Sequence, residues 1–406
     1  MKAASLLSME EALERLLMVQ AVASSAESVD LLEAPGRILA EPVVSTIHVP
    51  PQDNSSMDGY AVRLADAALF ATGLPVSQRI PAGVVSAPLA AGTAARIFTG
   101  AEVPRGADAI IMQEDAVADG DHVKFSVVPE SGAWIRPQGF DIKAGETILD
   151  AGQWLRTQDV ALAASIGIPT VKVRSRLRVA TFFTGNELAM PGDVLEPGKI
   201  YNSNQYILNG LLRRLPVEHI DLGLVPDTLE DTMAVLKQSA QSGDLVITTG
   251  GVSVGEEDHV RPAVQALGHL DLWALAIKPG KPLAFGRVGR EDGSQASFIG
   301  LPGNPVSSLV TFLMFVRPLL LKLAGATEVL PKRIPMRADF NWSKPDRRRE
   351  FLRVRRNADG GLDLFPNQNS AVLTSTVWAD GLIDNPPQHA IQKGDWVEYL
   401  PFGELL

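Results

Sequence analysis

The chain has 406 residues, of which 46% are hydrophobic and 21% are charged, and its formal net charge is −10. This composition is typical of a globular protein with several domains, because one hydrophobic core rarely grows beyond about 300 residues. The negative charge argues against recruitment of nucleic acid, and the absence of cysteine excludes disulfides, thiolate metal sites and cysteine nucleophiles. An anionic ligand would therefore need a local basic pocket.

The first part of the chain predicts a discontinuous N-terminal domain of mixed helix and strand, formed by residues 1–45 and 141–176. Ser8 and Glu11 have the spacing of a helix capping box, and no basic stretch followed by an apolar core precedes them. We therefore expect no secretory signal. The lack of cysteine suits a reducing compartment, and the predicted location is the cytoplasm.

Residues 46–140 predict a small inserted β domain with a linking loop, because short β-like runs alternate there with Gly and Pro. Asp58 precedes a glycine in a loop rich in polar residues, and Thr99 lies in a second loop of small residues. The sequence around Asp58 is equally typical of a plain hairpin turn. Asp141 stands where the chain returns to the N-terminal domain.

Residues 177–326 alternate strand and helix patterns, which predicts a three-layer αβα domain around a mostly parallel sheet. Ligands of such sheets bind at the carboxyl ends of the strands. The apolar run at 306–323 contains Ser, Arg and Lys, so we interpret it as a buried helix rather than a membrane span. Small or polar residues occupy the predicted strand ends at 184–187, 226–227, 249–258 and 301–304.

One stretch of this domain offers an anion site and a metal site together. The predicted strand at 245–249 is followed by Gly250, Gly251 and Ser253, and Asp258 precedes a helical pattern. Backbone N–H groups at such a turn bind anions, and the acids could hold a divalent cation beside the anion. The alternative is a tight turn whose acids only cap the helix.

Two further turns are candidate anion sites. Lys278 and Lys281 bracket a Pro-Gly pair, which directs two cations toward one region. The alternative is that these residues form the solvated tip of a hairpin. Asn304 lies in a proline-bounded turn that leads into a helix. The N–H groups of this turn could bind an anion, or the turn could only connect a strand to the helix sharply.

The candidate carboxylates are more numerous than one ion needs. Mg²⁺ typically takes one or two carboxylates and completes its shell with water and phosphate oxygens. Asp227 and residue 230 have capping-box spacing, so Asp227 alternatively caps a helix. The histidines lack the spacing of a zinc site. The candidates in predicted loops are Asp58, Asp141, Glu187, Asp227 and Asp258.

Residues 327–406 predict a C-terminal β-barrel-like domain, since the helical period gives way to short strands. Arginines cluster at 347–356, and we expect one or two of them to contact a ligand or a partner. The predicted fold is therefore multidomain, with α/β and β domains.

Motifs follow one another through nearly the whole chain: SMDGYAV at 56–62, TG at 99–100, RPQGFD at 136–141, TGNEL at 184–188, YNSN at 201–204, TGGVSVG at 249–255, KPGKP at 278–282 and PGNP at 302–305. In this order they resemble the molybdopterin molybdenumtransferase family, which includes the bacterial MoeA proteins and the gephyrin E domain. Asn186 departs from the aspartate that is common in the family, and the C-terminal match is loose.

The resemblance implies an elongated homodimer of four-domain subunits that inserts molybdate into adenylylated molybdopterin, with Mg²⁺-dependent release of AMP. It places the active site between the αβα domain of one subunit and the first domains of the other. It also implies contacts with other proteins of molybdenum cofactor biosynthesis, and no nucleic-acid or membrane partner is expected. The predicted catalytic acids are Asp58, Asp141, Glu187, Asp227 and Asp258, with Glu187 and Asp258 on the metal; the predicted substrate contacts are Thr99, Gly250, Gly251, Ser253, Lys278, Lys281, Asn304 and Arg353.

Two other functions stay open at this point. Molybdopterin adenylyltransferases share the TGGVS and PGNP turns, so adenylyl transfer is an alternative activity. A non-catalytic scaffold, as in gephyrin, is an alternative from another class.

Overall fold

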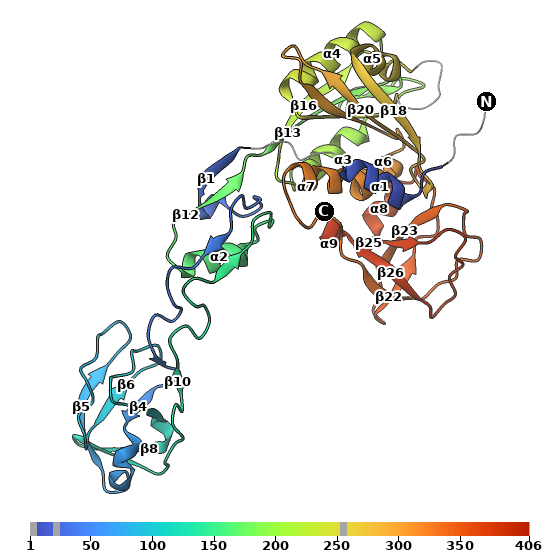
Figure 1. Cartoon of the computed structure of the whole chain (residues 1–406). Helices are drawn as coiled ribbons and strands as arrows, with labels where there is room; N and C mark the ends of the chain where they lie inside the picture. Colours follow the sequence, from blue (N-terminus) through green and yellow to red (C-terminus); the bar gives the residue numbers. More distant parts are fainter. Residues whose placement is uncertain (1–5, 19–24, 252–257, 406) are drawn as a thin grey trace.

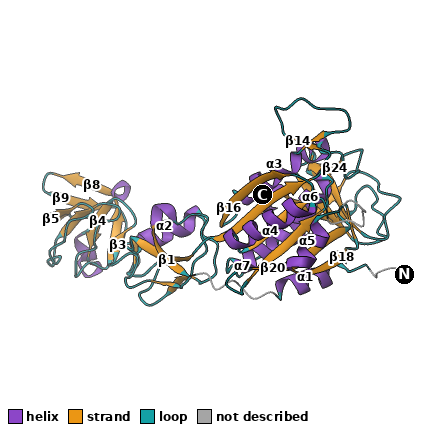
Figure 2. Cartoon of the chain, turned by 90° about the horizontal axis from the view of Figure 1, so that it is seen from above, coloured by secondary structure: helices purple, strands orange, loops and turns teal. Residues whose placement is uncertain are grey.

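The computed structural model describes residues 6–18, 25–251 and 258–405. The molecule is elongated, with the inserted β domain at one end and the αβα and C-terminal domains together at the other (Figure 1). The view turned by 90° shows the same extended arrangement (Figure 2).

The N-terminal domain is built from two distant segments of the chain. Their apolar side chains share one core, which includes Leu39, Leu155 and Val171. Strand β1 pairs antiparallel with β12, and β2 pairs with β11. The elements are β1 (Ala26–Asp30), the 3-10 turn η1 (Leu31–Glu33), β2 (Val43–Val44), β11 (Thr147–Leu149), α2 (Thr157–Ser165) and β12 (Thr170–Arg174).

Helix α1 (Met9–Leu17) does not join this core, although the predicted boundary at residue 45 assigns it to the N-terminal domain. Its apolar face packs with α7 into the core of the αβα domain. The predicted capping box is confirmed, because Ser8 Oγ accepts from the Glu11 N–H at 3.1 Å and Glu11 Oε2 accepts from the Ser8 N–H at 2.9 Å. The capping box determines where α1 starts, but it does not determine whether the core of the N-terminal domain or that of the αβα domain buries the helix.

The inserted domain holds a six-stranded sheet of order β7-β4-β6-β5-β9-β8, and a small ribbon of β3 and β10 connects it to the rest. Its elements are β3 (Asn54–Ser55), β4 (Gly59–Val62), η2 (Leu64–Leu69), β5 (Leu74–Ile80), β6 (Ala94–Ile97), β7 (Ala109–Met112), η3 (Gln113–Asp115), β8 (Ala116–Asp119), β9 (His122–Phe125) and β10 (Ile135–Arg136).

The αβα domain has a six-stranded sheet of order β16-β13-β17-β21-β20-β18. Strands β16, β13, β17 and β21 run parallel, β20 runs antiparallel to β21, and the edge strand β18 pairs antiparallel with β20 and so runs in the direction of the first four. Helices α4 and α5 cover one face, while α3, α6, α7 and α1 cover the other (Figure 1). The strands are β13 (Leu177–Thr184), β16 (Val217–Val225), β17 (Leu245–Thr249), β18 (Gly268–Ala274), β20 (Pro282–Gly289) and β21 (Gln295–Leu301).

The long apolar helix of this domain is a core helix, as the sequence predicts. It is long and apolar enough to cross a membrane, but 94% of it is buried inside the protein. It comprises α6 (Pro305–Thr311), the π-helical η4 (Phe312–Val316) and α7 (Arg317–Leu323); the other helices are α3 (Ser203–Leu212), α4 (Leu229–Ser242) and α5 (Val260–Leu267), and a small ribbon pairs β14 (Leu188–Ala189) with β15 (Ile200–Tyr201).

The C-terminal domain is a closed β-barrel, because β23 pairs with both β24 and β25. Strand β19 leaves the αβα domain and pairs with β23, so the two domains share a strand contact. The elements are β19 (Ile277–Lys278), β22 (Ile334–Ala338), β23 (Arg349–Arg356), β24 (Gly361–Leu364), α8 (Thr374–Trp378), β25 (Gly381–Asn385), β26 (Trp396–Pro401) and α9 (Phe402–Leu405).

Candidate functional site

The turns after β17 and β21 meet at one edge of the parallel sheet. Gly250 donates its N–H to Leu301 O at 3.0 Å, and a Cβ on Gly303 would lie 3.8 Å from the Gly250 Cα. Asn204 of α3 links both turns, since its Nδ2 donates to Gly303 O at 2.8 Å and to Thr249 Oγ1 at 3.2 Å. The predicted site residues at this edge therefore sit on one rigid frame. Asn204 is a residue of the YNSN motif that we did not single out.

Gly251 is required at its position for two reasons. Its φ of +63° lies in the left-handed region, and an added Cβ would approach Val260 Cγ2 to 2.6 Å. The bare backbone lets the start of α5 pack directly against the turn. Ser253, together with the neighbouring acids of the turn, lies outside the described residues.

Asp258 uses one carboxylate oxygen for the helix and leaves the other free. Oδ1 accepts from the N–H groups of Val260 at 3.1 Å and Arg261 at 3.3 Å. Oδ2 is buried and has no hydrogen-bond partner among the described residues. Burial raises the pKa of Asp258 above its ordinary value, and the negative charge of Asp227 adds to the rise. The cap interpretation and the ligand interpretation of this acid are therefore compatible.

Asp227 does not cap helix α4, so the predicted capping box is wrong by one residue. Thr228 is the N-cap, and its Oγ1 accepts from the Asp231 N–H at 3.1 Å. Asp227 Oδ1 instead accepts from the buried Thr184 Oγ1 at 2.8 Å, across the ends of β16 and β13. Since the cap is provided elsewhere, the carboxylate of Asp227 is available for a ligand.

Glu187 is exposed just after β13, on the same edge of the sheet as Asp227. A Cβ on Gly185 would lie 2.6 Å from Glu187 Oε2, so the glycine gives room for the carboxylate to fold back over its own turn. Among the described residues, no group of three or more carboxylates or imidazoles forms a ready metal site. Asp258 Oδ2, which has no partner in the part of the chain that the structure describes, fits a Mg²⁺ ion that takes few protein ligands.

Asn304 is the N-cap residue of α6, and its side chain makes no capping hydrogen bond. Its position at the end of β21 places it beside the Gly250 turn through Gly303. The α6 N-terminus also contacts the C-terminal domain, because the Val306 N–H donates to Ser370 O at 3.2 Å.

The two lysines of the KPGKP motif have different environments. Pro279 and Gly280 are buried, and a Cβ on Gly280 would lie 2.4 Å from Thr311 Oγ1, so this turn is not a solvated hairpin tip. Lys278 Nζ lies 3.2 Å from Glu350 Oε1 and 3.5 Å from Asp346 Oδ2. The Lys281 side chain is exposed. Lys278 therefore carries a compensated charge, and Lys281 is the better candidate for direct contact with an anion.

Arg353 is buried inside the C-terminal barrel. Its side chain is only 1% exposed, where Nη1 donates to Phe351 O at 2.9 Å and Nε donates to Ser375 Oγ at 3.3 Å. Burial lowers the pKa of Arg353 to about 10. The prediction that it binds substrate stays a prediction; within the chain, Arg353 Nη2 also donates to Asn369 O at 3.5 Å, in the segment before α8.

Asp58 and Thr99 form a unit in the inserted domain. Asp58 Oδ1 accepts from both the N–H and the Oγ1 of Thr99 at 2.8 Å, and these donors lower the pKa of Asp58. Asp141 is exposed, and its N–H donates to Val49 O at 2.9 Å. Asp58 directly precedes β4 and Asp141 follows β10, and these strands lie at the opposite end of the molecule from the αβα domain that carries the strand-end turns (Figure 1). A single subunit therefore does not bring all the predicted acids together.

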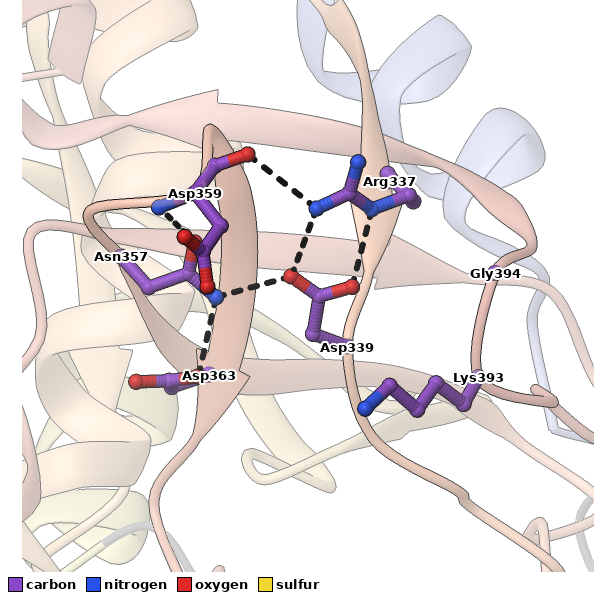
Figure 3. A pocket seen from close by; sticks show the side chains of 7 residues that line it. All are labelled: Arg337, Asp339, Asn357, Asp359, Asp363, Lys393 and Gly394. Atoms are coloured by element: carbon purple, nitrogen blue, oxygen red, sulfur yellow. Dashed lines mark hydrogen bonds and ion pairs between the residues drawn. The ribbon is translucent and has the colours of Figure 1, made fainter.

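A surface pocket in the C-terminal barrel is a poor candidate for the reaction. Arg337 pairs with Asp339, and Asn357 Nδ2 donates to Asp339 and Asp363 at 2.9 and 3.1 Å (Figure 3). These donors lower the pKa of Asp339 to about 2. Arg337 and Asp339 neutralise each other in this pocket, and none of the predicted site residues lines it.

Comparison with known proteins gives a consistent result over the whole chain. The sequence matches the descriptions "MoeA N-terminal region (domain I and II)" over residues 7–167, "Probable molybdopterin binding domain" over 180–322 and "MoeA C-terminal region (domain IV)" over 335–402. A molybdopterin molybdenumtransferase of Haemophilus influenzae is 39% identical, covering 99% of this chain and 100% of its own length. Another from Nostoc sp. is 40% identical over 74% of this chain and 70% of its own. A MoeA structure from Pyrococcus horikoshii OT3 has a TM-score of 0.83 at 29% identity, covering 98% of this chain and 100% of that one.

Proposed function

Because the chain belongs to the molybdopterin molybdenumtransferase family, we propose that it transfers molybdate to adenylylated molybdopterin and releases AMP. It is a transferase of molybdenum cofactor biosynthesis; the adenylylated form of the acceptor is the proposal. The observation that carries it is Asp258 at the carboxyl edge of the sheet: its Oδ2 is buried without a partner among the described residues, and its Oδ1 would lie 3.3 Å from a Cβ on Gly251.

The strand-end turns are suited to the phosphate groups of such a substrate. Gly250 fixes the turn through its bond to Leu301 O, the bare backbone of Gly251 offers an N–H group, and Lys281 offers an exposed ammonium. Asp258 and Glu187 would hold Mg²⁺, which would neutralise charge on the leaving phosphate. Asp227, held by Thr184, would orient the water shell or the substrate. The sulfur ligands of molybdenum would come from the pterin, since the chain has no cysteine.

The remaining acids support a site shared between subunits. Asp58 and Asp141 lie far from the turns of their own chain, so they would act on the turns of a second copy in a homodimer (Figure 1). The cytoplasm, with the other proteins of the same pathway, is the proposed location. Similarity over the entire length of a molybdenumtransferase, rather than over the αβα domain alone, disfavours the adenylyltransferase alternative.

The test is release of AMP from adenylylated molybdopterin by the full chain, with and without molybdate and Mg²⁺. We expect release that requires both. A chain that instead consumes ATP with unmodified molybdopterin would be an adenylyltransferase, and one that binds the pterin without releasing AMP would be a scaffold.

A further inference from the structure

Two arginines of the inserted domain share one aromatic ring. Arg79 on β5 and Arg96 on β6 are directly opposite in the register of these parallel strands. The guanidinium carbon of each lies 4.6 Å from the centroid of the Phe98 ring. Arg96 also lies over Tyr60, at 5.1 Å. The ring therefore orders two neighbouring cations on one face of the sheet.

The two guanidinium groups have no carboxylate in direct contact among the described residues, although the charge of Arg96 also acts on the nearby Asp58. In the described part of the chain neither makes an ion pair with a carboxylate, although the protein as a whole carries a net charge of −10. Arg96 Nη1 donates to Gly59 O at 2.9 Å and its Nη2 donates to Gln113 Oε1 at 2.7 Å, both neutral acceptors. Like charges placed opposite each other on neighbouring strands repel. Such a pair is stabilised when an anion lies between or above the two groups.

The remaining donors are those that an oxyanion needs. A guanidinium has five N–H donors, and Arg96 uses two of them within the protein. Arg79 is exposed, so the N–H donors of its guanidinium group are open to solvent. Arginine stacked on an aromatic ring keeps its in-plane donors free, and it binds tetrahedral oxyanions better than lysine because its fork is planar and weakly hydrated.

We propose that Arg79 and Arg96, held by Phe98, form a binding site for a tetrahedral oxyanion on the inserted domain. The site adjoins Asp58 and Thr99, because Thr99 follows Phe98 and the charge of Arg96 contributes to the lowered pKa of Asp58. The assignment of its occupant rests on the proposed function, which supplies two such groups: molybdate itself and the phosphate of the nucleotide-bearing pterin. The site would deliver one of them to the acids of the inserted domain.

The test is equilibrium dialysis of the full-length chain against molybdate and, separately, against inorganic phosphate at low ionic strength. All proteins carry Lys281→Gln, so that the lysine turn does not contribute. Arg79→Gln removes one guanidinium, and Phe98→Leu keeps an apolar side chain but removes the ring. The matched control is Arg355→Gln, since Arg355 is exposed and its guanidinium carbon lies 4.4 Å from the Trp378 ring, in another domain.

We expect Arg79→Gln and Phe98→Leu each to weaken binding about tenfold, the size of one charge-assisted hydrogen bond, and Arg355→Gln to bind like its parent. A loss for molybdate alone assigns the site to molybdate, and equal losses for both probes assign it to tetrahedral oxyanions in general. Unchanged affinity for both probes in Arg79→Gln and Phe98→Leu, with unchanged thermal unfolding midpoints, would overturn the proposal. AMP release by the wild-type chain tests the proposed function by itself. The proposed function and the proposed oxyanion site can therefore fail separately.

Discussion

The Lys278 ammonium lies 3.2 Å from the Glu350 carboxylate and thereby joins the αβα domain to the C-terminal barrel. Glu350 is 1% exposed, and its second oxygen accepts from Trp342 Nε1 at 2.7 Å and from the Asp346 N–H at 3.1 Å. The carboxylate is therefore fixed before any ligand arrives. A lysine held in this way has a defined position, and its charge is compensated by its carboxylate partners.

Replacing Glu350 with Gln should destabilise the protein by about 2 kcal/mol, because a buried partner of Lys278 and its charge are lost while Lys278 stays partly exposed. The measurement is the free energy of unfolding in urea. Glu41→Gln is the matched control, since Glu41 pairs with Lys172 at the surface, with 57% of each side chain exposed. That change should cost about 0.5 kcal/mol or less. Equal costs for the two variants would show that the Lys278 pair is only a surface contact.

Asp258→Asn should raise stability at neutral pH although it removes a site residue. Burial raises the pKa of Asp258 in the folded protein, so ionisation of this group opposes folding. The Asp258 carboxyl therefore makes its full contribution to the free energy of unfolding below the pKa that an aspartate has in the unfolded chain. This contribution is lost as the pH rises through the raised pKa of Asp258 in the folded protein. Above that range the variant should unfold at a higher urea concentration than the wild type, and in acid the two should converge. A variant that is less stable at neutral pH would show that the carboxylate is stabilised by its helix.

Asp227→Asn and Thr228→Ala separate a ligand role from a capping role. Asn keeps an acceptor for Thr184 but loses the charge, so AMP release should fall by about tenfold or more with little change in stability. Thr228→Ala removes the N-cap of α4 and should cost about 1 kcal/mol in unfolding free energy, while AMP release is retained. The reverse pattern would mean that Asp227 caps the helix after all.

Gly251→Ala should damage the site more than the same change at an exposed turn. Both Gly251 and Gly293 have positive φ, so alanine costs about 1 kcal/mol at each. At Gly251 the new Cβ also meets Val260 Cγ2 at 2.6 Å, whereas nothing lies within 4 Å at Gly293. Unfolding free energies and pterin affinities should both fall for Gly251→Ala, and only a small stability loss is expected for Gly293→Ala. Similar results for the two would contradict the close packing of α5 on the turn.

The location of the strand-end residues was predictable because parallel strands bring their carboxyl ends to one edge. Asp227 follows β16, Gly250 and Asp258 follow β17, and Asn304 follows β21, and the alternation of strand and helix was enough to group these three strand ends. The capping pattern at Ser8 likewise fixed the start of α1. These predictions rest on local patterns with a fixed period or a fixed spacing.

Other features depend on contacts between distant segments, which local patterns do not encode. The apolar face of α1 predicts burial but not the partner, and it joins the αβα domain rather than the N-terminal one. Arg353 lies between buried residues on both sides of a barrel strand, so no alternation marked it as internal. Glu350 belongs to no motif, and the inserted domain's Arg79 and Arg96 meet only because β5 and β6 pair.

The most direct test of the account compares AMP release with substrate binding in wild type and Asp258→Asn at saturating Mg²⁺. Asp258 Oδ2, unpaired among residues 6–18, 25–251 and 258–405, is expected to act on the leaving phosphate rather than on the bound pterin. We predict that AMP release falls about a hundredfold while the affinity for adenylylated molybdopterin changes little. Equal turnover by the variant and the wild type would contradict the central role assigned to this carboxylate.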